Sequence, residues 1–139
     1  MYTSLSRWPV YAPALRWCSC TTIGFLVVPL LFMHLPTPAL AGGMAAKLFT
    51  AQTWVSVACG GILLLISTSK QASAPAQRAH DAIVFILLGL LLALLVEFAV
   101  APRIVTRTNL KLWHSVGSVM YLVQWLCAAI VFWRITPKQ

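Results

Sequence analysis

The residues best suited to chemistry lie in one segment, from Glu97 to His114, between two long apolar runs. This segment, EFAVAPRIVTRTNLKLWH, has a carboxylate embedded in an apolar run, then Arg103, then His114 at the start of the next run. An unpaired charge in hydrocarbon costs at least about 2.5–3.5 kcal/mol on insertion scales, so Glu97 must be protonated, paired or open to water. We expect Arg103 or His114 to be its partner.

Two further polar residues belong to the same predicted site. In an antiparallel bundle the end of a first helix, the start of a second, the end of a third and the start of a fourth meet at one membrane face. The predicted polar cluster is therefore His34, Gln52, Glu97, Arg103 and His114. It either ties the third and fourth helices together or forms a proton, ion or ligand site, for which histidine has a suitable titration range.

The composition places this site in a membrane protein. The chain has 139 residues, of which 60% are hydrophobic and 9% are charged, and its mean hydropathy is +0.88. In soluble domains about a quarter of the residues are charged. Ten Lys and Arg stand against two acidic residues, but the cations lie between or beside the apolar runs, as lipid-facing anchors do. The expected partner is the lipid bilayer, with other membrane subunits or a second copy as further partners, and not nucleic acid.

Four apolar runs predict the fold class: an all-α integral membrane four-helix bundle, antiparallel and up-down, with both termini on the same side. We expect an interfacial N-terminal segment over residues 1–16 and a membrane domain over 17–139. The expected spans cover residues 17–35, 48–69, 82–102 and 112–133, each long enough to cross a bilayer. Ala39-Leu40-Ala41 before Gly42 also fits a signal-peptide cleavage site. The long aromatic N-terminal region and Pro29 favour a retained first helix.

The distribution of cations gives an expected orientation. Six Lys and Arg lie with the termini and the central loop, and four lie with the other two loops. Because cytoplasmic loops carry an excess of these residues, we expect both termini in the cytoplasm and the protein in the inner membrane of a bacterial cell.

Small and polar residues recur at helical spacing in three of the four runs. Helices in lipid associate through close packing of small residues and a few hydrogen bonds, so these positions predict the inward faces. In addition to members of the polar cluster, the predicted packing residues are Ser56, Gly60, Gly89, Ala93, Gly117 and Tyr121.

Metal or haem ligation is a weaker interpretation of the same chain. His34 and His114 fall at one depth, as two axial haem ligands would, and Met33, Met44 and Met120 are soft donors of the kind copper prefers. Cys18 and Cys20 supply only two of the ligands that a zinc site needs. Isolated Met and Cys in apolar helices are usually packing residues. We therefore expect no metal and no cofactor.

Two stretches resemble a known family. They are GFLVVPLLFMHLPTPALAGGMAAKLF and EFAVAPRIVTRTNLKLWHSVGSVMYL, which look like the transmembrane protein 205-like proteins, small four-helix membrane domains of unknown function. The matching features are Gly24 and Pro29, Leu48-Phe49, Pro102-Arg103 and His114. The resemblance implies that the first helix is retained, and it implies no chemistry.

The sequence contains none of the usual motifs of soluble enzymes. There is no phosphate-binding glycine loop and no G-x-S-x-G, and two carboxylates are too few for most hydrolytic schemes. We expect a multi-pass membrane protein that is not an enzyme and has a structural or accessory role. The alternatives are a proton-linked or small-ligand binding or permeation protein and, second, a haem- or copper-binding redox protein.

Overall fold

The structure is a computed structural model that describes residues 8–69, 76–107 and 109–136. Within these residues the chain forms helices and no strand. Four helices are long and apolar enough to cross a membrane, namely Val10–His34, Pro38–Ile66, Ala82–Val105 and Leu110–Ile135. The predicted all-α four-span bundle is confirmed.

Two of the four spans are interrupted by short π-helical segments. The first span consists of α1 (Trp8–Thr21), η1 (Thr22–Val27) and α2 (Val28–His34). The second is α3 (Pro38–Ser69). The third consists of α4 (Ala76–Leu95), η2 (Val96–Val100) and α5 (Ala101–Val105), and the fourth is α6 (Leu110–Ile135). η1 and η2 are the π-helical segments.

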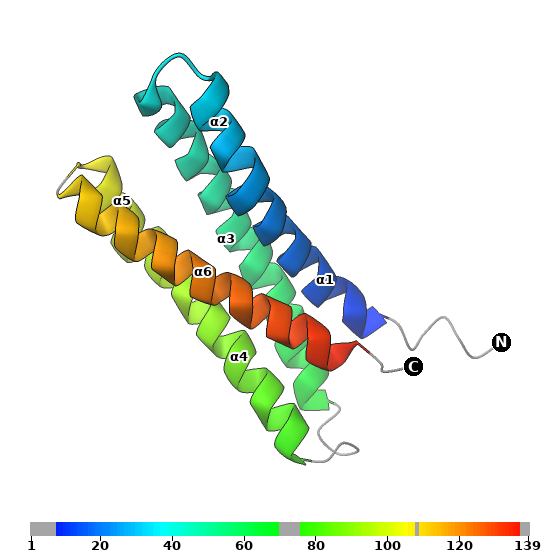
Figure 1. The fold of residues 1–139 in the computed structure, drawn as a ribbon. Coiled ribbons are helices and arrows are strands. Elements are labelled where there is room, and N and C mark those ends of the chain that lie inside the picture. The colour runs from blue at the N-terminus through cyan, green and yellow to red at the C-terminus, as the bar shows by residue number, and fades with distance from the viewer. Residues whose placement is uncertain (1–7, 70–75, 108, 137–139) are drawn as a thin grey trace.

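The spans form a closed ring. α1 packs against α3 and α6, and α4 packs against the same two helices. Successive spans run in opposite directions, so α1 begins and α6 ends at the same end of the bundle (Figure 1). This arrangement follows from short connections, because a tight loop between two helices makes them antiparallel neighbours.

The first helix begins at Trp8, nine residues before the predicted start at residue 17. Residues 1–7 of the predicted interfacial segment lie outside the described residues. Pro9 falls in the first turn, where a helix needs no backbone N–H, and Pro13 lies in the helix interior but close to its start. The two prolines therefore do not prevent the helix, and Arg16 lies inside it instead of anchoring its end.

A repeated sequence explains the two π-helical segments. Phe25 to Pro29 reads F-L-V-V-P and Phe98 to Pro102 reads F-A-V-A-P. Proline has no N–H to give to the carbonyl four residues earlier, which favours a local widening of the helix. In agreement, the Val28 N–H bonds the Ile23 carbonyl and the Ala101 N–H bonds the Val96 carbonyl, each five residues back.

Beyond these segments two helical hairpins, α2–α3 and α5–α6, diverge from each other. The main contacts of α2 are with α3 and η1, and those of α5 are with η2 and α6. Figure 1 shows the α2–α3 pair separating from the α5–α6 pair toward the end opposite the termini. The ring is therefore tight near the termini and open toward the two short loops.

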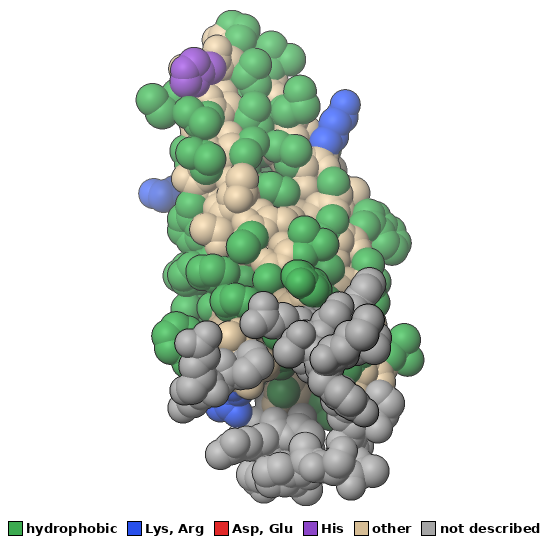
Figure 2. All heavy atoms as spheres, turned by 90° about the vertical axis from the view of Figure 1, so that its right-hand side faces the viewer, with side chains coloured by type: hydrophobic (Ala, Val, Ile, Leu, Met, Phe, Trp, Pro, Cys, Tyr) green, Lys and Arg blue, Asp and Glu red, His purple; other side chains and the backbone are tan. Residues whose placement is uncertain are grey.

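Large apolar side chains cover the outside of the bundle. Met33, Leu65 and Trp133 are each more than 70% exposed. Figure 2 shows hydrophobic side chains spread over the described part of one face, with Lys or Arg projecting at only a few places. Such a surface would aggregate in water, but it suits lipid tails.

Candidate functional site

Glu97 lies on η2 at the point where the two hairpins begin to diverge. Its side chain is half-buried and accepts a hydrogen bond of 2.8 Å from the Thr50 hydroxyl of α3. This bond joins the second and third spans. The carboxyl is thus held by a neutral hydroxyl group from a residue outside the predicted cluster.

Arg103 and His114, the predicted partners of Glu97, face elsewhere. The Arg103 Nη1 donates to the Ala99 carbonyl at 2.9 Å, and its guanidinium lies 4.3 Å from the centre of the Trp113 ring. The His114 side chain is exposed at the start of α6. Successive helical residues are rotated by about 100°, so a residue six positions after Glu97 points to a different side of the helix. The expected ion pair is not formed.

His34 and Gln52 also lie apart from Glu97. His34 is exposed at the end of α2, where its Nδ1 is 3.0 Å from the Leu30 carbonyl oxygen. Gln52 is buried and faces α1, where its Nε2 donates to Ser19 Oγ and to Cys20 Sγ, both at 3.0 Å. In the described part of the chain, no hydrogen bond therefore joins any two of the five predicted residues.

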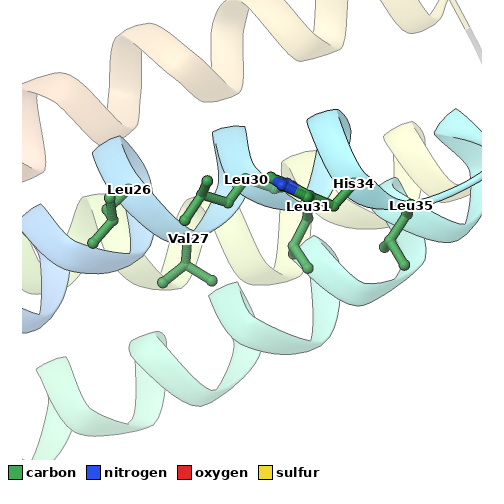
Figure 3. A pocket seen from close by; sticks show the side chains of 6 residues that line it. All are labelled: Leu26, Val27, Leu30, Leu31, His34 and Leu35. Carbon is green, nitrogen blue, oxygen red and sulfur yellow. The ribbon is translucent and has the colours of Figure 1, made fainter.

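His34 borders a shallow apolar hollow along η1 and α2. Its lining residues are Leu26, Val27, Leu30, Leu31, His34 and Leu35. Figure 3 shows Val27, Leu31 and Leu35 pointing toward α3. The lining offers one polar side chain, so the hollow suits a hydrocarbon chain of a lipid better than a polar ligand.

A second ionisable centre lies inside the ring of helices. Arg16 of α1 is only 1% exposed, and none of its Nε, Nη1 and Nη2 atoms has a hydrogen-bond partner among the described residues. Its guanidinium is close enough to Cys20, Cys59 and Cys127 to interact with each electrostatically. A Cβ added to Gly89 would lie 2.6 Å from Arg16 Nη2 and 3.4 Å from the Cys127 Cβ. Each of the four spans thus contributes to the surroundings of this guanidinium.

The four residues that meet around the guanidinium, one from each span, lie at the same depth along the bundle. Arg16 lies six residues after Val10, Cys59 seven before Ile66, Gly89 seven after Ala82 and Cys127 eight before Ile135. At a rise of 1.5 Å per residue, each is about 9–12 Å inside the end of its span that lies near the termini. The agreement in depth shows that the four helices meet at this level.

Polar contacts continue from Arg16 toward the middle of the bundle. The Tyr121 hydroxyl donates to the Cys20 carbonyl at 2.7 Å, and the Trp125 Nε1 donates to Thr21 Oγ1 at 2.8 Å. Together with the bonds of Gln52, they attach α1 to both α3 and α6. Such bonds stabilise transmembrane helix pairs by about 0.6 kcal/mol on average.

The predicted packing residues are either buried or lie at a close approach of two spans. Ser56 and Ala93 are buried, an added Cβ on Gly60 would meet Leu90, and one on Gly117 would meet Val100. Gly89 lies against Arg16, and the Tyr121 ring lies so close to Gly24 that a Cβ there would overlap it. The small residues therefore mark close approaches of the helices.

Comparison with known proteins places the chain in a family. The sequence model of a domain of unknown function, DUF4149, matches residues 12–112. The chain belongs to this family. The match includes Arg16, Thr50, Gly89 and Glu97 and ends near the start of α6. No curated protein and no solved structure matches the chain.

Like Thr50, Arg16 of this DUF4149 protein was not among the residues predicted from the sequence. The signal was a stripe in the first span, Pro13, Arg16, Cys20 and Gly24, with spacings of three, four and four residues. Starting the span at residue 17 cut this stripe and made Arg16 look like an interfacial anchor. Pro13, Arg16 and Cys20 are all fully buried.

The residues considered for metal ligation are dispersed in the DUF4149 protein. Cys18 is exposed whereas Cys20 is buried, and both Met33 and Met44 are exposed. Across the described ranges, no three side chains of His, Cys, Asp or Glu are arranged to hold a metal ion.

Proposed function

We propose that this DUF4149 protein is a proton-linked membrane binding or permeation protein in which Glu97 takes up and releases the proton. One observation carries the proposal: Glu97 is an intramembrane carboxyl group whose hydrogen-bond partner is the neutral Thr50 hydroxyl. Ionisable groups inside membranes are costly and are typical of proton, ion and ligand sites.

The position of Glu97 supports this proposal. A purely structural carboxylate would be expected to pair with a cation, but Arg103 bonds its own helix and Trp113 instead. A threonine hydroxyl both donates and accepts, so it can stay bonded to either protonation state of Glu97. Glu97 also lies within a π-helical segment, and such segments occur frequently at functional sites.

Infrared spectroscopy tests the protonation of Glu97 directly, because the chain has only two acidic side chains, Asp81 and Glu97. In Asp81→Asn protein, we expect the carbonyl band of a protonated side-chain carboxyl group to change with pH, and this change to be absent after a further Glu97→Gln substitution. A carboxyl carbonyl band that does not change with pH in the Asp81→Asn protein contradicts the proposal.

Transport is measured in vesicles that contain a pH-sensitive dye. We expect an imposed membrane potential to drive proton entry through wild-type protein and through Asp81→Asn, and Glu97→Gln to reduce it to the level of empty vesicles. Thr50→Val removes the hydroxyl at Glu97 and should slow entry. Thr53→Val is the matched control, since the Thr53 hydroxyl donates to the Phe49 carbonyl of its own helix. Equal rates for wild type and Glu97→Gln would exclude proton transfer by Glu97.

An accessory role in a larger complex is a second candidate, favoured by the divergence of the hairpins. The main contacts of α2 are with α3 and η1, and Phe25, Leu26 and Met33 in this span are exposed. A helix of a partner subunit could pack on this side. Purification in mild detergent, followed by identification of the proteins recovered with it, should yield a stoichiometric membrane partner if this role applies.

Several further expectations remain proposals. We propose a bacterial inner-membrane location with cytoplasmic termini, no enzymatic activity, and kinship with the transmembrane protein 205-like proteins. The excess of Lys and Arg with the termini and central loop supports the orientation. A reporter fused after Gln139 should be found in the cytoplasm. An extracytoplasmic reporter would reverse the proposed orientation.

A further inference from the structure

A guanidinium group with no counter-charge among the described side chains lies at the tight end of the bundle. Arginine stays protonated in proteins, and leaving such a charge uncompensated in a buried site is strongly unfavourable. Yet Arg16 is 1% exposed, and its three nitrogen atoms have no hydrogen-bond partner within the described part of the chain. The described side chains therefore leave this positive charge unbalanced.

The described residues supply no carboxylate to Arg16. Glu97 bonds Thr50 and lies eight residues from Val105, at the other end of its span. Three buried cysteines, Cys20, Cys59 and Cys127, lie near enough to the guanidinium to interact with it electrostatically. Thiols are only weak hydrogen-bond donors, and a protonated thiol carries no charge that could balance the guanidinium. Gln52 Oε1 is buried and has no partner among these residues either, but a neutral amide cannot balance the charge.

We propose that Arg16 binds a small monovalent inorganic anion of the halide class inside the bundle. One anion balances the one buried charge. It must be small, because α4 approaches the guanidinium so closely that a Cβ on Gly89 would lie 2.6 Å from Nη2. Weakly hydrated anions fit best, because thiols and apolar side chains replace lost water poorly. The site is independent of Glu97.

Thermal unfolding tests this binding, because a ligand that binds only the folded state raises the Tm with its concentration. Purified protein in mild detergent is titrated with chloride or bromide against gluconate at constant ionic strength. We expect the Tm of the wild type to rise by about 5 °C between gluconate and saturating halide. Arg16→Met should show no halide dependence and should be at least as stable as wild type in gluconate, since it removes an uncompensated charge.

Arg103→Gln is the matched control, because Arg103 is an exposed arginine with a partner carbonyl in its own helix. It should keep the full halide dependence, as should Glu97→Gln. A wild-type Tm that is independent of halide, or equal halide dependence in wild type and Arg16→Met, would overturn the proposal.

A second measurement needs no variant. Wild-type protein crystallised in bromide should give an anomalous-scattering peak beside the Arg16 guanidinium. If saturating bromide leaves that position empty or occupied by water, the proposal fails, and the charge is then balanced by a thiolate of the chain or by hydration.

Discussion

At the scale of single residues, two ionisable side chains are accommodated in different ways. Glu97 is half-buried where the hairpins diverge and accepts a bond from Thr50. Arg16 is enclosed by all four spans and has no hydrogen-bond partner among the residues that the structure describes. The difference follows from the packing around each residue, because only the end of the bundle near the termini is closed.

Gly24→Ala should destabilise the protein, because the new Cβ would overlap the Tyr121 ring. That ring cannot easily move, since its hydroxyl bonds the Cys20 carbonyl and its ring lies 5.1 Å from that of Phe49. Overpacking of this kind costs about 1–3 kcal/mol. The measurement is thermal unfolding in detergent.

Gly61→Ala is the control for this substitution, since a Cβ there meets nothing within 4 Å. It should be neutral or stabilising by up to about 1 kcal/mol, because alanine is the better helix former. Equal Tm values for the two variants would mean that the close approach of Gly24 and Tyr121 does not contribute to the stability of the protein.

At the scale of elements, the repeated F-x-V-x-P sequence sets the geometry of the first and third spans. Each copy widens its helix by one residue before a proline. An extra residue in a turn rotates the helix on its N-terminal side by about 100° relative to the helix on its C-terminal side. The segment η2 therefore decides which neighbour the Glu97 carboxyl meets.

Pro102→Ala should convert η2 toward a regular α-helix and turn Glu97 away from Thr50. We expect the rate of disulfide formation between Thr50→Cys and Glu97→Cys to fall several-fold when Pro102→Ala is added. The four native cysteines are first replaced by alanine. Pro36→Ala, in the connection between α2 and α3, should leave the rate unchanged. An unchanged rate with Pro102→Ala would show that proline does not maintain the π-helical segment.

At the scale of the whole molecule, an apolar outer surface is combined with a net charge of +8. The exposed cations Lys47, Arg103, Arg107 and Lys111 lie toward the open end of the bundle. Cations near a membrane surface attract anionic headgroups with about 1 kcal/mol each. We therefore expect bilayer composition to affect the stability of the bundle.

Replacing zwitterionic by anionic lipid in nanodiscs should raise the Tm, and high salt should remove the gain because it screens exposed charges. The double variant Lys47→Gln with Lys111→Gln should lose part of the gain, about 2 kcal/mol at most. Lys47→Arg with Lys111→Arg keeps both charges and should behave as wild type. A gain that survives high salt would point to packing of the lipid tails rather than to charge.

The sequence by itself determined the four spans. Backbone polar groups in lipid must be bonded within a helix, so the apolar runs leave little choice of structure. Small residues at helical spacing then mark the faces that approach closely, as Gly89 and Gly117 do. These features depend on neighbours along one helix, which the sequence contains.

The tertiary structure alone decided the partners across the bundle. Thr50 as the partner of Glu97, and the enclosure of Arg16 by Cys20, Cys59, Gly89 and Cys127, depend on how far each helix is shifted and rotated relative to the next. The spacing of residues within one helix does not determine the shift and rotation of that helix relative to its neighbours. The first helix begins nine residues before its predicted start, and two π-helical segments of six and five residues interrupt the first and third spans. These differences were enough to change which polar groups meet.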